Sequence, residues 1–339
     1  MAVTLKEVAA RAGVSRSAVS RTFTPGASVS AKMRRKVEIA AQELGYQPNA
    51  LASSLTTGRT KLIGLVSNNF HNPVFLEIFD RFTRGLQDKG LRPLLVNLSD
   101  ETEPENSVRM LRQYSVDGVV VASSTLPPGF ARAFGAAGVP VVHAFGRVSG
   151  ASGVAVVGID NVECGRMAAR TLAARGYGRV GFLGGPETAT STQDRFAGFR
   201  AGLAGFPEIA VSHSFAGDYT FEAGRREMLR LVEAGPAEAY FCGDDVLSIG
   251  AMSALADRGL AVPGDVGIIG LNDMEIAGWD NIRLTTIRQP IGEIVAGAIE
   301  AMVTMLAAPE AVPASRVFAC EVVERATLRP LTVAGAPGR

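Results

Sequence analysis

The sequence predicts two folded modules: a small all-α head with a helix-turn-helix pattern, and an α/β body of two doubly wound parallel-sheet lobes. Residues 4–24 contain two short helical patterns separated by a glycine. From about residue 61 onward, apolar strand-like runs alternate with amphipathic helix-like stretches. Charge is also uneven, because residues 1–61 hold ten basic and three acidic residues whereas the rest of the chain holds 24 and 30. This asymmetry is typical of a nucleic-acid-binding module joined to one that does not bind nucleic acid.

Composition places the chain among globular proteins. Its 339 residues are 47% hydrophobic and 20% charged, which is ordinary for a protein with a sizeable core. Its three cysteines, Cys164, Cys242 and Cys320, are scattered and odd in number, which argues against a disulfide framework and for a reducing compartment. The sequence shows no signal-peptide pattern and no apolar run near the ~18 residues of a membrane span. We therefore expect a cytoplasmic protein without a membrane segment.

The head begins with signals for three helices. Thr4 and Glu7 have the spacing of a capping box, and Gly13 suits the end of the first helix. Ser15 and Ser30 are suited to cap the second and third helices. The third helix should run through Leu44, with its apolar side chains facing inward; these are Val37, Ile39, Ala40 and Leu44.

In a helix-turn-helix the second helix lies in the major groove of DNA with its first residues toward the base edges. Those residues are Arg16 and Ser17, with Arg21 one turn further, and arginine can donate two hydrogen bonds to guanine. Basic residues crowd the start of the third helix, where they oppose the helix dipole unless phosphates neutralise them; a solvated surface is the alternative. The predicted DNA contacts of the head are Thr4, Ser15, Arg16, Ser17, Ser20, Arg21, Ser30 and Lys32.

Strand-like runs in the body alternate with amphipathic stretches such as 75–89, 162–175 and 246–258. This alternation predicts parallel sheets covered by helices on both faces, and about 270 residues favour two such lobes. The predicted strands are 62–66, 93–98, 118–122, 139–142, 154–159, 180–183, 239–242 and 266–271.

Ligands of such folds bind at the carboxyl ends of the strands, here in the cleft between the lobes. Residues after the predicted strands include Ser123, Arg147 and Asp160, and many others there are Asn, Asp or aromatic. Such a set suits a polyhydroxylated ligand. An enzyme is the rival interpretation, but the histidines lack metal-ligand spacing, and neither a nucleophile elbow nor a phosphate-binding loop occurs. We therefore expect no catalysis, no cofactor and no metal.

Residues 3–15 (VTLKEVAARAGVS) and 18–21 (AVSR) resemble the start of the LacI/GalR (lactose-repressor) family of bacterial transcriptional regulators. The resemblance continues through 29–32 and 44–49 and reaches 327–330. It implies a sequence-specific DNA-binding repressor with a periplasmic-binding-protein-like body. It also implies a hinge after Pro48 that folds on DNA, in which Asn49 contacts the operator and Leu55 wedges into a central base step.

The same resemblance implies which residues bind the effector. The matching positions include Phe75, Arg195, Tyr219 and Asn272. Two positions depart from the family pattern: Asn272 stands where the family has an acid, and Asp244 stands where it has an asparagine. The full set of predicted effector contacts is Phe75, Ser123, Arg147, Asp160, Ser191, Arg195, Tyr219, Asp244 and Asn272.

The predicted domains are a head over 1–48, a hinge over 49–60 and an effector-binding and dimerisation body over 61–339. Lobe 1 should span about 61–158 and 289–317, and lobe 2 about 159–288 and 318–330. A homodimer would supply the two heads that a palindromic operator needs. The expected effector is a sugar or sugar derivative. Two alternative functions are open: a periplasmic-type sugar-binding protein, and a nucleobase-responsive, corepressor-dependent regulator.

Overall fold

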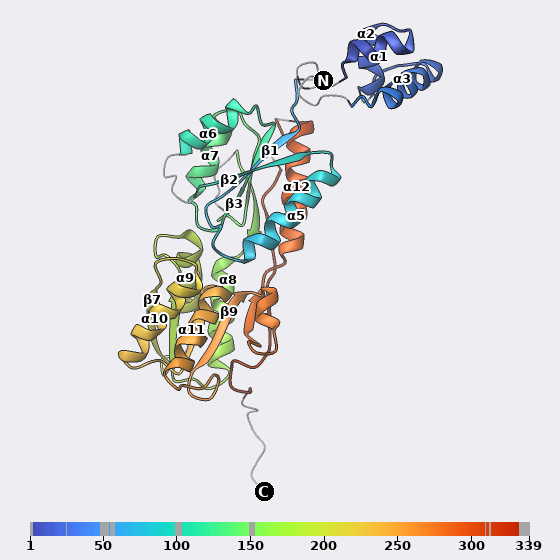
Figure 1. Cartoon of the computed structure of the whole chain (residues 1–339). Coiled ribbons are helices and arrows are strands. Elements are labelled where there is room, and N and C mark those ends of the chain that lie inside the picture. Colours follow the sequence, from blue (N-terminus) through green and yellow to red (C-terminus); the bar gives the residue numbers. More distant parts are fainter. Residues whose placement is uncertain are drawn as a thin grey trace. The chain divides into compact units, whose positions relative to one another are not determined.

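The structure is a computed structural model that describes residues 3–24, 26–47, 54, 58–98, 104–148, 153–308, 310–311 and 313–331. Its contacts divide the chain into two compact units, Met1–Lys61 and Leu62–Arg339 (Figure 1). We refer to them as the head and the body, and describe each by itself. The predicted hinge contacts Asn49 and Leu55 lie outside the described residues.

The described residues of the head include three helices: α1 (Leu5–Ala12), α2 (Arg16–Phe23) and α3 (Ala31–Leu44). The predicted caps are confirmed. Thr4 and Glu7 form a capping box, and Ser15 and Ser30 accept hydrogen bonds from backbone amides of the helices they begin. Gly13 adopts a left-handed conformation (φ 64°), which a side chain would disfavour, and so turns the chain from α1 to α2.

The core of the head is small and apolar. Val8 and Val19 are fully buried against Val37 of α3, and Ala9, Ala40 and Ala41 complete the cluster. The expectation that Ile39 faces inward is wrong, because its side chain is 50% exposed. Positions 37, 40, 41 and 44 form a stripe at helical spacing, and position 39 falls on the opposite side of the helix.

Lobe 1 of the body contains a six-stranded sheet in the order β11-β5-β4-β3-β1-β2, in which all paired strands are parallel. Helices α5 and α12 lie side by side on one face, and α6 and α7 cover the other (Figure 1). Alternate residues along a strand pack into the apolar cores on the two faces of the sheet. For example, Val120 faces α12 and Val121 faces α7. The elements are β1 (Leu62–Ser67), α5 (Val74–Asp88), β2 (Arg92–Asn97), α6 (Pro104–Gln113), β3 (Gly118–Ala122), α7 (Pro128–Ala136), β4 (Val141–Ala144), β5 (Ala155–Ile159), α12 (Ile291–Ala307) and β11 (Arg316–Phe318).

Lobe 2 contains a second six-stranded sheet, in the order β12-β10-β9-β8-β6-β7. Its pairs are parallel except for the antiparallel pair of β10 and β12. Helices α8 and α9 pack on one face, and α10 and α11 on the other. The elements are α8 (Asn161–Ala173), β6 (Arg179–Gly184), α9 (Thr190–Leu203), β7 (Ala210–Phe215), α10 (Phe221–Glu233), β8 (Ala239–Cys242), α11 (Asp245–Asp257), β9 (Gly267–Asn272), the 3₁₀ turn η1 (Glu275–Gly278), β10 (Thr285–Arg288) and β12 (Glu321–Val323).

The chain crosses between the two lobes three times: from β5 to α8, from β10 to α12 and from β11 to β12. The predicted fold class, an all-α head with two doubly wound parallel lobes, is confirmed. Among the described residues, no helix combines the length and apolar character needed to span a membrane.

Helices α8 and α9 approach each other closely because glycines lie at their contact. A Cβ added at Gly198 would lie 1.9 Å from the carbonyl oxygen of Val162, and one added at Gly165 would lie 2.1 Å from that of Arg195. Both obstructing atoms belong to backbone, so neither can rotate away. The contact therefore places Arg195, on α9, directly against α8.

We predict that Gly198→Ala lowers the free energy of unfolding by about 3 kcal/mol, at the upper end for overpacking, because two helix backbones must separate. Urea unfolding followed by circular dichroism measures the loss. Gly205→Ala is the matched control, since an added Cβ there meets nothing within 4 Å. Equal stability of the two variants would contradict the prediction.

Candidate functional site

The head presents an exposed polar surface along α2. Arg16, Ser17 and Arg21 are all exposed. No ion pair or hydrogen bond joins the guanidinium of Arg16 or Arg21 to another described residue. Two other arginines of the head have structural partners: Arg11 pairs with Glu43 at 2.6 Å, and Arg34 donates to the carbonyl oxygen of Thr22 at 2.9 Å. Arg16 and Arg21 are therefore available to an external partner.

The remaining predicted DNA contacts of the head divide into two groups. Thr4, Ser15 and Ser30 use their hydroxyls as helix caps, and the Ser15 and Ser17 hydroxyls lie 3.0 Å apart. Lys32 is exposed at the start of α3, whereas Ser20 is only partly exposed. The cap residues orient backbone amides at helix starts, where phosphates of DNA bind favourably.

In the body, a small cavity lies between the two lobes. Residues that follow β1, β3 and β4 line it from lobe 1, and residues near the ends of β8 and β9 line it from lobe 2. Its volume is about 20 Å³, which holds about one water molecule. The lining consists of Asn69, Asn72, Val74, Phe75, Ile78, Ser124, Phe145, Arg195, Tyr219, Asp244, Asn272, Gln289 and Ile291.

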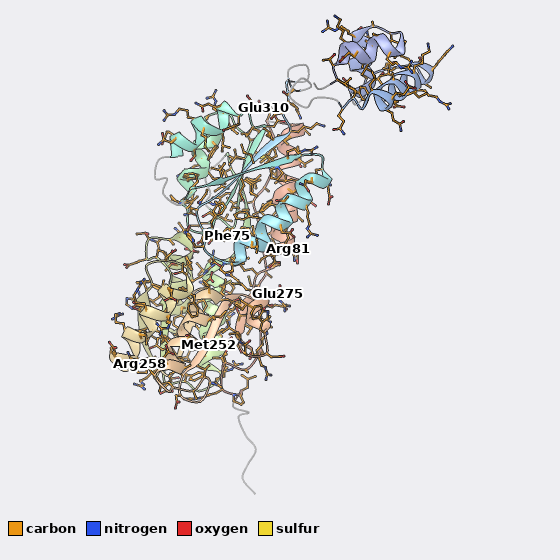
Figure 2. The ribbon with its side chains drawn as sticks, viewed as in Figure 1. Phe75, Arg81, Met252, Arg258, Glu275 and Glu310 are labelled. Atoms are coloured by element: carbon orange, nitrogen blue, oxygen red, sulfur yellow. The ribbon has the colours of Figure 1, made fainter. Side chains whose placement is uncertain are left out.

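Five of the nine predicted effector contacts line this cavity: Phe75, Arg195, Tyr219, Asp244 and Asn272. Figure 2 shows Phe75 at the end of α5 that approaches lobe 2. The other four do not line it, Asp160 lines a different cavity, and each has a partner within the protein.

Arg147 forms the clearest of these internal contacts. Its guanidinium makes a two-pronged ion pair with Asp194 of α9, with N–O distances of 2.8 and 2.7 Å. Because Arg147 follows β4 of lobe 1, this pair bridges the two lobes.

The hydroxyl and carboxylate side chains in this group also have protein partners. Ser123 donates to Asn68 at 2.8 Å, and Ser191 lies 3.3 Å from the Tyr219 hydroxyl. Asp160 is exposed and accepts a hydrogen bond from the backbone amide of Glu163 at the start of α8.

The buried Asp244 carboxylate connects the two lobes. Its Oδ2 accepts hydrogen bonds from Nδ2 of Asn72, in lobe 1, and Nδ2 of Asn272, in lobe 2, each at 2.8 Å. Its Oδ1 accepts from the amide of Val246 and caps α11. Burial raises the pKa of Asp244, while these hydrogen bonds and the charge of Arg195 act in the opposite direction.

Arg195 is buried on α9, with 3% of its surface exposed. Its Nε donates to Oδ1 of Asn161 at 2.8 Å, and its Nη1 donates to the carbonyl oxygen of Gly243. Its Nη2 makes no hydrogen bond to any described residue. The cavity therefore contains a positive charge with an unused donor close to a carboxylate.

The sequence-based prediction left out several lining residues. Asn72 and Phe145 were recognisable as residues that follow strands, but their contacts were not, because Asn72 and Asp244 are 172 positions apart. Gln289 directly follows β10, which was not among the predicted strands, and Ile291 is the first residue of α12. Gln289 donates to Oδ1 of Asn272 and so continues the polar network.

Two buried titratable groups flank the cavity network. Burial raises the pKa of Asp245 to about 7, although Thr286 and the amide of Met274 donate hydrogen bonds to its carboxyl group. Burial lowers the pKa of His143 to about 4, and the Nε2 of this residue lies 3.0 Å from the carbonyl oxygen of Ser123. No cluster of three potential metal ligands occurs among the described residues.

Comparisons with known proteins match both units. Residues 4–49 match the family "Bacterial regulatory proteins, lacI family", and residues 169–328 match "Periplasmic binding protein-like domain". The HTH-type transcriptional repressor PurR of Escherichia coli O139:H28 is 34% identical over 293 residues, which are 85% of each chain.

Solved structures also resemble this chain over nearly its full length. One is the lac repressor dimer bound to operator and the anti-inducer ONPF, with a TM-score of 0.85 and 26% identity over 97% of this chain and 100% of the other. The second is a complex of the transcriptional regulator CelR with cellobiose, with a TM-score of 0.69 and 28% identity over 96% and 99%. These findings confirm the resemblance predicted from the sequence.

Asp245→Asn should remove a pH-dependent loss of stability. An acid whose pKa is raised on folding stabilises the protein while protonated, so this contribution is lost as pH rises from about 4 to about 7. Between pH 5 and pH 8 the wild type should lose about 3 kcal/mol relative to the variant, since one pKa unit corresponds to about 1.4 kcal/mol. Urea unfolding at both pH values measures the difference. Asp280→Asn, at an exposed carboxyl, is the control, and a parallel response of both variants would refute the assignment.

Proposed function

This DNA-binding transcriptional regulator belongs to the lacI family, and from that premise we propose that it is a homodimeric repressor whose operator affinity is controlled by a sugar or sugar derivative bound between the lobes. The observation that carries the ligand site is that two charged residues, Arg195 and Asp244, are buried and line the interlobe cavity without an ion pair between them. Burying charged groups is costly unless they are paired or serve a ligand. Here Nη2 of Arg195 makes no hydrogen bond within the described protein.

The chemistry of the cavity supports a polyhydroxylated ligand. Asp244 supplies acceptor oxygens, Asn72 and Asn272 supply carboxamides, and Arg195 supplies a donor. The ring of Phe75 supplies an apolar surface for the C–H side of a sugar. The similar CelR structure contains cellobiose, a disaccharide.

Ligand entry requires the lobes to separate, because a cavity of about 20 Å³ is far smaller than a monosaccharide. The contacts that a ligand must replace are those between lobes, including Asn72 to Asp244 and Arg147 to Asp194. Control follows if ligand prefers one lobe arrangement, with a coupling of about 1–3 kcal/mol, or roughly 5–150-fold in operator affinity.

On the DNA side, two heads of a dimer would read the half-sites of a palindromic operator with Arg16, Ser17 and Arg21. The similar lac repressor structure is a dimer on operator DNA. The hinge assignment of Asn49 and Leu55 rests on the sequence alone, since both lie outside the described residues.

A nucleobase is the second candidate for the effector. The observation in its favour is that Phe75 and Phe145 both line the cavity, where aromatic rings could stack on a flat heterocycle. A thermal-shift screen against sugars, sugar acids and nucleobases separates the two classes. If nucleobases stabilise the protein and sugars do not, the effector is a nucleobase and not a sugar.

Arg195→Ala should abolish the stabilisation that the screen detects while leaving operator binding intact. Loss of a charged donor to a buried ligand should weaken ligand affinity at least tenfold, about 1.4 kcal/mol. Isothermal titration with the hit compound measures the affinity. Arg200→Ala is the matched control, because Arg200 is exposed on the same helix. Unchanged affinity in Arg195→Ala would place the ligand elsewhere.

Arg21→Ala should weaken binding to the operator selected from a random-sequence library by about 1–3 kcal/mol and relax preference at one base pair. Fluorescence anisotropy at fixed salt measures this loss. Arg11→Ala removes the same charge from a residue that is paired with Glu43. This variant should therefore change the affinity for all DNA sequences about equally. If both variants lose the same affinity for every DNA sequence, Arg21 does not contact base edges.

A further inference from the structure

Two cysteines meet at the crossover between the lobes. Cys164 lies in the first turn of α8, shortly after the chain leaves β5 of lobe 1. Cys320 lies between β11, the last strand of the first sheet, and β12 of the second. Each cysteine therefore belongs to a segment along which the chain passes from one lobe to the other.

Both cysteines line one open cavity of about 400 Å³. Within it the two thiols lie close enough for each to shift the pKa of the other. Cys164 is 1% exposed, whereas Cys320 is partly exposed, so a small reagent reaches Cys320 first. Asp160, Glu163 and Phe318 are among the other lining residues.

The contact makes the two thiols unequal. The interaction with the Cys164 thiol lowers the pKa of Cys320, and the charge of Arg195 acts in the same direction. The interaction with the Cys320 thiol and burial raise the pKa of Cys164. Because the thiolate is the nucleophile, Cys320 is the more reactive of the pair. Cys242 is a useful contrast, since burial raises its pKa to about 12.

We propose that Cys164 and Cys320 are an oxidation-sensitive pair that hydroperoxides convert into an intramolecular disulfide across the lobe crossover. The Cys320 thiolate attacks a peroxide oxygen and becomes a sulfenic acid, while the other oxygen leaves as alkoxide or hydroxide and takes up a proton. The Cys164 sulfur then attacks the sulfenic sulfur, and its proton leaves with the hydroxyl as water. Two thiols are oxidised by two electrons in total, and one peroxide bond is reduced.

The disulfide would act on the part of lobe 2 that supports the effector site. Cys164 is three residues from Asn161, whose Oδ1 holds Nε of Arg195. A covalent bond between α8 and the β11–β12 segment would restrict movement of the lobes about this crossover. Disulfides of proteins in reducing compartments are commonly transient and redox-sensing, which fits a reversible bond here. The inference does not depend on the identity of the effector.

The test treats the full-length protein with hydrogen peroxide, then denatures it, alkylates free thiols and maps the peptides by mass spectrometry. The wild type should yield a peptide that links Cys164 to Cys320 within one chain, reversed by dithiothreitol, while Cys242 remains alkylated. Cys164→Ser should instead accumulate sulfenic acid at Cys320, trapped by dimedone. Cys320→Ser should give neither product.

Cys242→Ser is the matched control, and it should form the disulfide as the wild type does. Cys164→Ala provides a second variant if the serine destabilises α8, and the wild-type peptide map requires no variant at all. Three alkylated thiols after peroxide treatment of the wild type would overturn the proposal. So would a linkage only between Cys320 residues of two chains.

Discussion

The buried carboxylate of Asp244 links side chains of both lobes at the interlobe cavity. It accepts hydrogen bonds from Asn72 of lobe 1 and Asn272 of lobe 2, and it caps α11 through the amide of Val246. A carboxylate removed from water requires such donors, so the two lobes satisfy it jointly. In the proposed function, a ligand hydroxyl takes the place of the Asn72 donor when the lobes separate. Binding would then be an exchange of partners on Asp244 that is linked to the arrangement of the lobes.

The hydrogen bond between Asn272 and Asp244 explains how the two departures from the family pattern fit together. Asn272 and Asp244 have exchanged acid and amide relative to that pattern, and their side chains are hydrogen-bonded to each other. The exchange keeps one carboxylate and one carboxamide in contact and moves the negative charge from the end of β9 to the start of α11. A helix N-terminus favours a negative charge, which helps to offset the cost of burial. The pattern of donors and acceptors offered to a ligand is changed without adding a charge to the cavity.

Much of the fold could be predicted because its signals are local. The capping box at Thr4, the turn at Gly13 and the apolar runs of the central strands all depend on neighbouring residues. Strand β7 escaped prediction because this edge strand, with its exposed His213, lacks a continuous apolar run. Phe75 and Arg195 could be placed by resemblance, whereas the pairing of Arg147 with Asp194 could not. That pair joins residues 47 positions apart, and nothing near either residue specifies the other.

In the proposed function, a small ligand shifts the balance between two arrangements of the lobes. The lobes are joined by three crossovers, by polar contacts and by apolar packing, since one buried apolar cluster includes residues of both lobes. The side chains of the Arg147–Asp194 pair are 33% and 22% exposed, so solvent screens it and its net worth is about 1 kcal/mol or less. The hydrogen bond from Asn72 to the Asp244 carboxylate also crosses between the lobes and is worth roughly 1.5–3 kcal/mol, because its acceptor is charged. Energies of this size are comparable with those of a few ligand hydrogen bonds, so in the proposed function an exchange of partners on Asp244 would offset the loss of these polar contacts.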